Sequence, residues 1–124
     1  TQDEFAEDFF GTISKYAPPP PPGVPKPNEW GDEEIVKERF KDYASNIEFT
    51  KRTTELVYDV DPAGTTEYFV NYFGPIKTVY EFLDDDEQDK FKDEITEVFK
   101  KHNISKGHDT VMVGQYLQVT ATKA

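Results

Sequence analysis

Residues 16–31 have the sequence YAPPPPPGVPKPNEWG. Its five consecutive prolines end any helix that reaches them, because proline lacks a backbone donor and its ring clashes with the preceding turn. We therefore predict a rigid, extended polyproline connector over 18–28. The only tryptophan, Trp30, follows this connector, and Asp32 then suits the N-cap of a new helix.

Apolar side chains recur at helical spacing on both sides of the connector. This pattern predicts a helix over 2–17 and a second helix over 32–44. The residues that we expect on their buried sides are Phe5, Phe9, Ile13 and Tyr16 in the first helix and Ile35, Val36, Phe40 and Tyr43 in the second.

Two stretches favour long strands, over 47–60 and 110–122. In the first, the apolar side chains change from odd to even positions, which predicts a bulge or bend near 52–55. In the second, one face is expected to carry Val111, Val113, Leu117, Val119 and Ala121.

Three helices are predicted between these strands. Asp61-Pro62 ends the first strand, a helix follows over about 63–73, and Gly74-Pro75 separates it from a short helix that ends near Leu83. The acidic corner at 84–86 can cap the third helix. Its buried stripe is predicted to contain Phe91, Ile95, Val98, Phe99 and His102.

The predicted fold class is α+β when the chain is taken alone, with about five helices and two long antiparallel strands in a single domain over 1–124. Two strands make a marginal sheet with exposed edges. We therefore expect further strands from elsewhere, supplied by a longer polypeptide or by a homodimer formed through the strand edges.

Composition excludes several functions. The 124 residues include 25 acidic and 14 basic side chains, a net charge of −11, which opposes binding to nucleic-acid phosphates or an anionic membrane surface. The absence of cysteine excludes disulfides and thiolate catalysis and is compatible with the predicted cytoplasmic location. No apolar run reaches membrane-spanning length.

Four stretches resemble the C-terminal half of class I S-adenosylmethionine-dependent methyltransferases of the small-molecule, ubiquinone-biosynthesis-like type. These stretches are EFAEDFFGTISKYAPPPPPGVPKPNEWGDEE at 4–34, IEFTKRT at 47–53, YFVNYFGP at 68–75 and VGQYLQVTATK at 113–123. The resemblance covers nearly the whole chain and consists of packing and turn patterns rather than catalytic signatures.

The resemblance implies an α/β parent enzyme with a doubly wound Rossmann-like sheet, whose S-adenosylmethionine is held by a glycine-rich turn after its first strand. This chain has no such unit, since its seven glycines are isolated. We therefore expect it to shape the pocket for a small-molecule methyl acceptor, and to bind no cofactor and catalyse no transfer alone. No catalytic residue is predicted.

Five aromatic residues are candidates for the substrate pocket. Trp30 would form an aromatic wall, although a role in anchoring the proline connector on the core is favoured. A lid of four aromatic residues on one helix is also predicted, although core packing of the same residues is favoured. The lid consists of Tyr68, Phe69, Tyr72 and Phe73.

Other charged and polar groups favour structural roles. His102 and His108 could form a base or metal pair, but no carboxylate spacing around them matches a metal site. The acidic run at 84–87 lacks the alternation and central glycine of a calcium loop. Lys51 and Arg52 suit either an acidic substrate or a protected strand edge. No metal site is predicted.

Two alternatives to the methyltransferase segment stay open. The chain could be a free-standing binding protein that holds an apolar ligand among its aromatic side chains. It could also be an interaction protein that dimerises through a sheet edge or a helix stripe.

Overall fold

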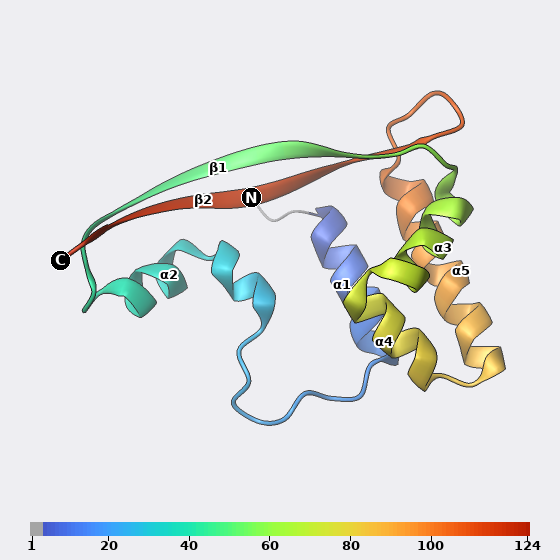
Figure 1. The fold of residues 1–124 in the computed structure, drawn as a ribbon, viewed down its shortest axis with the longest axis horizontal. Helices are drawn as coiled ribbons and strands as arrows, with labels where there is room; N and C mark the ends of the chain where they lie inside the picture. The colour runs from blue at the N-terminus through green and yellow to red at the C-terminus, as the bar shows by residue number, and fades with distance from the viewer. Residues whose placement is uncertain (1–3) are drawn as a thin grey trace. The chain divides into compact units, whose positions relative to one another are not determined.

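A computed structural model describes residues 4–124 and confirms the α+β class, with five α-helices and two antiparallel strands (Figure 1). Residues 2 and 3 of the predicted first helix lie outside the described residues. The elements are α1 (Glu4–Tyr16), the 3₁₀ helix η1 (Pro27–Gly31), α2 (Glu33–Phe40), β1 (Ala44–Tyr58), α3 (Pro62–Tyr72), α4 (Gly74–Phe82), α5 (Asp85–His102) and β2 (Thr110–Lys123).

The chain divides into two compact units. Unit 1 comprises Thr1–Pro19, of which 4–19 are described, and Glu55–Gly114, so that it holds α1, α3, α4, α5 and one part of the strand pair. Unit 2 comprises Pro20–Thr54 and Gln115–Ala124, with η1, α2 and the remaining part of the strand pair. Each unit is described by itself below.

Unit 1 contains the hydrophobic core. Its helices α1, α3, α4 and α5 pack side by side, and the predicted stripes of α1 and α5 face inward (Figure 1). Phe99 is fully buried, with ring centroids 5.9 Å from Phe9, 5.1 Å from Phe69 and 6.4 Å from Phe5. Such stacked and tilted rings contribute beyond their buried area, so this aromatic cluster holds three helices together.

Unit 2 has a much smaller core. Among its residues only Val36 is a buried hydrophobic side chain, while Ile35 and Phe40 are half-buried. Tyr43, predicted on the buried side of this helix, is exposed because α2 ends at Phe40 and a turn, with Tyr43 N donating to Phe40 O, leads into β1.

Aspartate side chains define the starts of three helices. Asp32 accepts from Glu34 N and Ile35 N, as predicted for an N-cap. Asp84 accepts from Glu87 N, and Asp61 accepts from Gly64 N immediately before Pro62. The local residues therefore fix these boundaries, as predicted for Asp32 and for the acidic corner at 84–86.

The proline-rich segment departs from the predicted continuous extended form over 18–28. Val24 N donates to Pro21 O, and Gly23 has a φ of 82°, which together define a turn with Pro22 at its second position. Proline presets the first central residue of such a turn and glycine tolerates positive φ at the next. The chain then enters η1 at Pro27.

The burial of β1 changes parity as predicted. Odd positions Ile47 and Phe49 are half-buried in unit 2, whereas even positions Leu56 and Tyr58 are half-buried in unit 1. The strand itself runs without interruption across 52–55. The buried parity changes because the first part of β1 belongs to unit 2 and the last part belongs to unit 1.

The prediction of which β2 side chains point inward is wrong at the start of the strand. Met112 and Thr110 are buried, while Val113 is exposed and Val111 is only half-buried. Met112 joins the core cluster of unit 1, and the Thr110 hydroxyl donates to Val60 O at 2.8 Å. A buried hydroxyl with a partner explains why a polar residue takes the inward position.

We predict that Phe99→Ala lowers the free energy of unfolding by about 3–5 kcal/mol, because it removes buried aromatic contacts and leaves a cavity. Phe82→Ala is the matched control, since Phe82 is 70% exposed. Its cost should stay within about 1 kcal/mol. Urea unfolding followed by circular dichroism measures both, and equal costs would contradict the assigned core.

Candidate functional site

Three tyrosines in contact form an exposed aromatic surface of unit 1. Tyr58 of β1 lies 5.9 Å from Tyr68 of α3, and Tyr68 lies 5.1 Å from Tyr72, measured between ring centroids. Tyr68 is 52% and Tyr72 74% exposed, while Tyr58 is half-buried. We call Tyr58, Tyr68 and Tyr72 the tyrosine ladder.

The two phenylalanines of the predicted lid lie behind this ladder. Phe69 is buried, within 5.3 Å of the Tyr58 ring and 5.1 Å of Phe99, and Phe73 is half-buried against Phe9 and Phe69. The helical period thus divides the four aromatic residues, with the phenylalanines in the core and the tyrosines outside. Burial, with Tyr68 beside it, raises the pKa of Tyr58.

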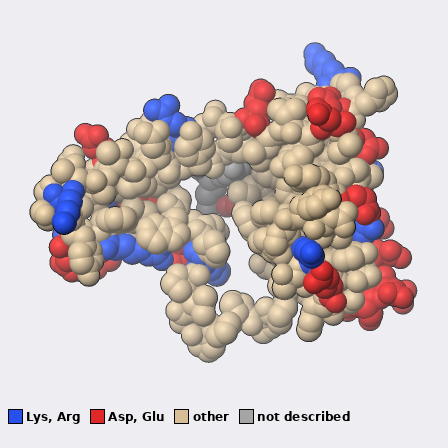
Figure 2. Space-filling model, in the orientation of Figure 1, with Lys and Arg blue, Asp and Glu red and all other residues tan. Residues whose placement is uncertain are grey.

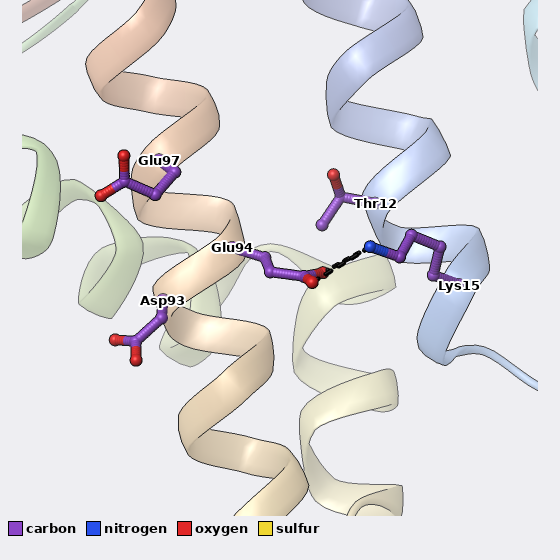
Figure 3. A pocket seen from close by; sticks show the side chains of 5 residues that line it. All are labelled: Thr12, Lys15, Asp93, Glu94 and Glu97. Carbon is purple, nitrogen blue, oxygen red and sulfur yellow. Dashed lines mark hydrogen bonds and ion pairs between the residues drawn. The ribbon is translucent and has the colours of Figure 1, made fainter.

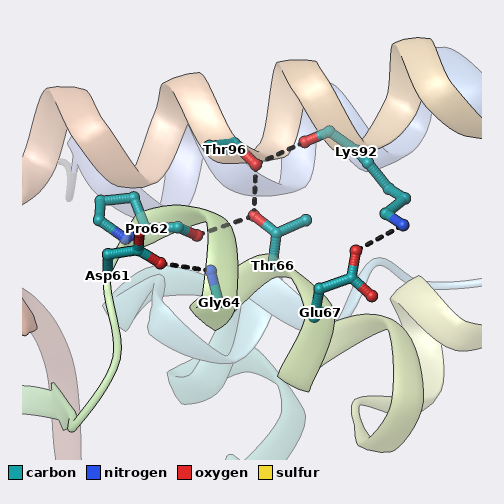
Figure 4. A network of polar contacts seen from close by, with 7 residues as sticks. All are labelled: Asp61, Pro62, Gly64, Thr66, Glu67, Lys92 and Thr96. Carbon is teal, nitrogen blue, oxygen red and sulfur yellow. Dashed lines mark hydrogen bonds and ion pairs between the residues drawn. The ribbon is translucent and has the colours of Figure 1, made fainter.

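A polar network joins α3 to α5 (Figure 4). The buried Thr66 hydroxyl lies 2.7 Å from the Thr96 hydroxyl, and each can also donate to a carbonyl of its own helix, Pro62 O or Lys92 O. Lys92 forms an ion pair with Glu67 of α3. These contacts orient the helix face that presents the tyrosines.

Trp30 belongs to unit 2, whereas the four other predicted pocket residues belong to unit 1. The Arg39 guanidinium lies 4.4 Å from the Trp30 ring centroid and also pairs with Glu29, while Phe40 lies 6.3 Å away in a T-shaped contact. Trp30 is 52% exposed. The stacked arginine gives this residue a packing role within unit 2.

The two histidines are not brought together as a metal pair. His102 Nε2 lies 2.7 Å from Asp8 Oδ2, and Lys101 Nζ lies 2.7 Å from the same oxygen. His108 is exposed in the loop before β2. No group of three or more potential metal ligands occurs among residues 4–124. The histidine at the end of α5 therefore joins that helix to α1.

A groove of about 360 Å³ between α1 and α5 carries mainly charged side chains. Lys15 approaches Glu94 at 3.0 and 3.1 Å, whereas Asp93 and Glu97 point away from that pair (Figure 3). The exposed Lys15–Glu94 pair is a surface ion pair that joins the two helices. Nothing in this groove pairs a nucleophile with a base.

The negative charge is confined to unit 1. Its described residues hold 17 acidic and 7 basic side chains, a net charge of −10, while unit 2 holds 7 of each. Acidic side chains gather over the helices of unit 1 in Figure 2. Within 55–73, which includes the ladder, there are four acidic residues and no lysine or arginine.

Comparison with known proteins gives relatives without an assigned role. The chain is 30% identical over 125 residues to "Uncharacterized protein Rv1403c" and "Uncharacterized protein MT1447" of Mycobacterium tuberculosis and to "Uncharacterized protein Mb1438c" of Mycobacterium bovis. The match covers 99% of this chain and 44% of each relative, so the chain spans less than half of their length. No family model and no solved structure matches the chain.

A membrane-crossing helix is absent from the part of the chain that the structure describes, since none of its helices combines sufficient length with sufficient apolar character.

We predict that Asp8→Asn removes part of the acid sensitivity of folding. The hydrogen bond from Lys101, followed by that from His102, lowers the pKa of Asp8. A lowered pKa in the folded state gives stability that is present above the ordinary carboxyl value, about 3.9, and is lost as pH falls through the folded value. The wild-type advantage over the variant should therefore shrink below about pH 4.

Urea midpoints between about pH 6 and pH 2.5 measure this difference. Asp93→Asn is the matched control, because Asp93 makes no hydrogen bond or ion pair with the described residues. A parallel pH dependence of the wild type and Asp8→Asn would contradict the prediction.

Proposed function

We propose that this chain is the C-terminal segment of an S-adenosylmethionine-dependent methyltransferase, and that it forms part of the pocket for a small-molecule methyl acceptor. On this proposal the chain contributes strands and helices to a larger sheet. The parts that hold the methyl donor belong to the rest of the enzyme, and this segment is inactive alone.

The observation that carries the proposal is the second strand. β2 has no charged residue from Thr110 to Thr122, yet it pairs with β1 alone in a two-stranded sheet. Natural proteins protect exposed edge strands with charges, prolines or bulges. β1 has such protection, with Glu48, Lys51 and Arg52, and β2 lacks it. An uncharged strand of this length suits the interior of a larger sheet.

The thin core of unit 2 supports the same conclusion. A single buried hydrophobic side chain, Val36, stabilises little structure by burial, whereas Tyr43 and Tyr116 leave large apolar surfaces exposed. Additional structure packed on this unit would bury such surfaces. The relatives have more than half of their length outside the match, which leaves room for a donor-binding half in proteins of that kind.

The described residues do not fit the methyl donor. β1 leads through Asp59 and Val60 to Asp61-Pro62 and α3, with no glycine-rich turn, and the only glycine with positive φ is Gly23, in the proline segment. A cradle for the donor needs close backbone approach after a strand. No step of methyl transfer is therefore assigned to these residues, and the resemblance places the donor on an upstream half.

On this proposal, the whole enzyme to which this segment belongs should bind S-adenosylmethionine, as measured by calorimetry, and the 124-residue chain alone should not. Hydrogen exchange supplies a second readout, because the amides of β2 should be protected more strongly in the longer protein. The full-length relative from Mycobacterium tuberculosis serves as a substitute protein for both measurements.

Methyl transfer by the 124-residue chain alone, or failure of the longer protein to bind the donor, would overturn the proposal. The dimer hypothesis predicts a different outcome, namely that the β2 edge becomes protected when the short chain is concentrated. Sedimentation of the same sample separates these cases, because only the dimer shows a rise in mass.

A further inference from the structure

The tyrosine ladder leaves two of its aromatic rings largely exposed to solvent. Its three hydroxyl groups have no hydrogen-bond partner among residues 4–124, and Tyr72 exposes three quarters of its surface. The rings are nevertheless held in place, because Tyr58 and Tyr68 contact the buried Phe69. A preorganised aromatic surface of this kind can contact a ligand at a low cost in side-chain ordering.

The charge around the ladder favours a cation. The segment 55–73 carries Glu55, Asp59, Asp61 and Glu67 without any basic residue of its own. Lys92 of α5 pairs with Glu67, which leaves the other three carboxylates without an ion pair in a unit whose described residues have a net charge of −10. Such a field raises the local concentration of cations and disfavours anions. Aromatic faces attract ammonium groups through their quadrupole, so the field and the rings select the same class of ligand.

Unit 1 already contains one contact between an ammonium group and a tyrosine ring. Lys92 Nζ lies 5.5 Å from the Tyr80 ring centroid, and Glu67 holds the ammonium group from the other side. This arrangement combines a tyrosine face and a carboxylate around one ammonium group. The ladder offers two such faces, Tyr68 and Tyr72, without an internal cation.

We propose that the tyrosine ladder binds the ammonium group of a small organic cation. The binding surface belongs to this chain and is independent of methyl transfer. Only the further step, that the methyl acceptor itself carries an ammonium group, rests on the proposed function.

The test uses choline as the cationic probe and 3,3-dimethylbutan-1-ol as its uncharged isostere. Both are titrated into the 124-residue chain while the tyrosine ring signals are followed by NMR. Choline should shift the signals of Tyr68 and Tyr72 and bind roughly two- to fivefold more tightly than the isostere. Added salt should reduce this preference.

Variants identify the rings responsible. Tyr72→Leu should abolish the preference for choline, whereas Tyr72→Phe retains the aromatic face and should retain the preference. Phe82→Leu is the matched control, because Phe82 is equally exposed but lies on α4 outside the ladder. Far-UV circular dichroism verifies that each variant is folded.

Equal binding of choline and its isostere would overturn the proposal, as would an equal loss in Tyr72→Leu and Phe82→Leu. No methyl donor is present in this titration. Failure of choline to bind therefore leaves the methyltransferase proposal intact, and failure of the longer protein to bind the donor leaves the cation site intact.

Discussion

The packing of aromatic rings around Phe99 is the interaction on which unit 1 depends. Phe5 and Phe9 come from α1 and Phe69 from α3, so one buried ring of α5 joins helices that are far apart in sequence. Helices of 11 to 18 residues gain most of their stability from such contacts rather than from propensity. The ion pairs of Lys15 and Asp8 also join α1 to α5, but they are solvent-exposed and contribute little stability by comparison.

Element boundaries could be predicted from sequence because their causes are local. Asp32, Asp61 and Asp84 cap helices through their own side chains, and proline at 62 and 75 begins helices where its missing donor costs nothing. The order of elements therefore followed from residues within one turn of each boundary. The turn at Gly23 was missed because the neighbouring prolines suggested a continuous rod.

The faces of elements were harder to predict because tertiary partners decide them. The apolar alternation around Met112 suited either parity, and the inward choice depends on Val60 O accepting from Thr110. Likewise, periodicity alone could not separate the buried from the exposed aromatic residues of α3 and its C-cap. These residues, Tyr68, Phe69, Tyr72 and Phe73, cover too wide an arc of the helix. Their chemistry gives the missing signal, since the two hydroxyl-bearing rings face water.

The distribution of charge links the fold to the proposed functions. Unit 1 tolerates its negative charge because twelve buried side chains form its core, and self-repulsion is spread over an exposed surface. Unit 2 has neither a large core nor net charge, and its strands bring an uncharged edge together with exposed Tyr116. A charged surface stays in solvent, whereas a neutral apolar one becomes an interface. The two proposals therefore assign different neighbours to the two units, a small cation to unit 1 and further protein to unit 2.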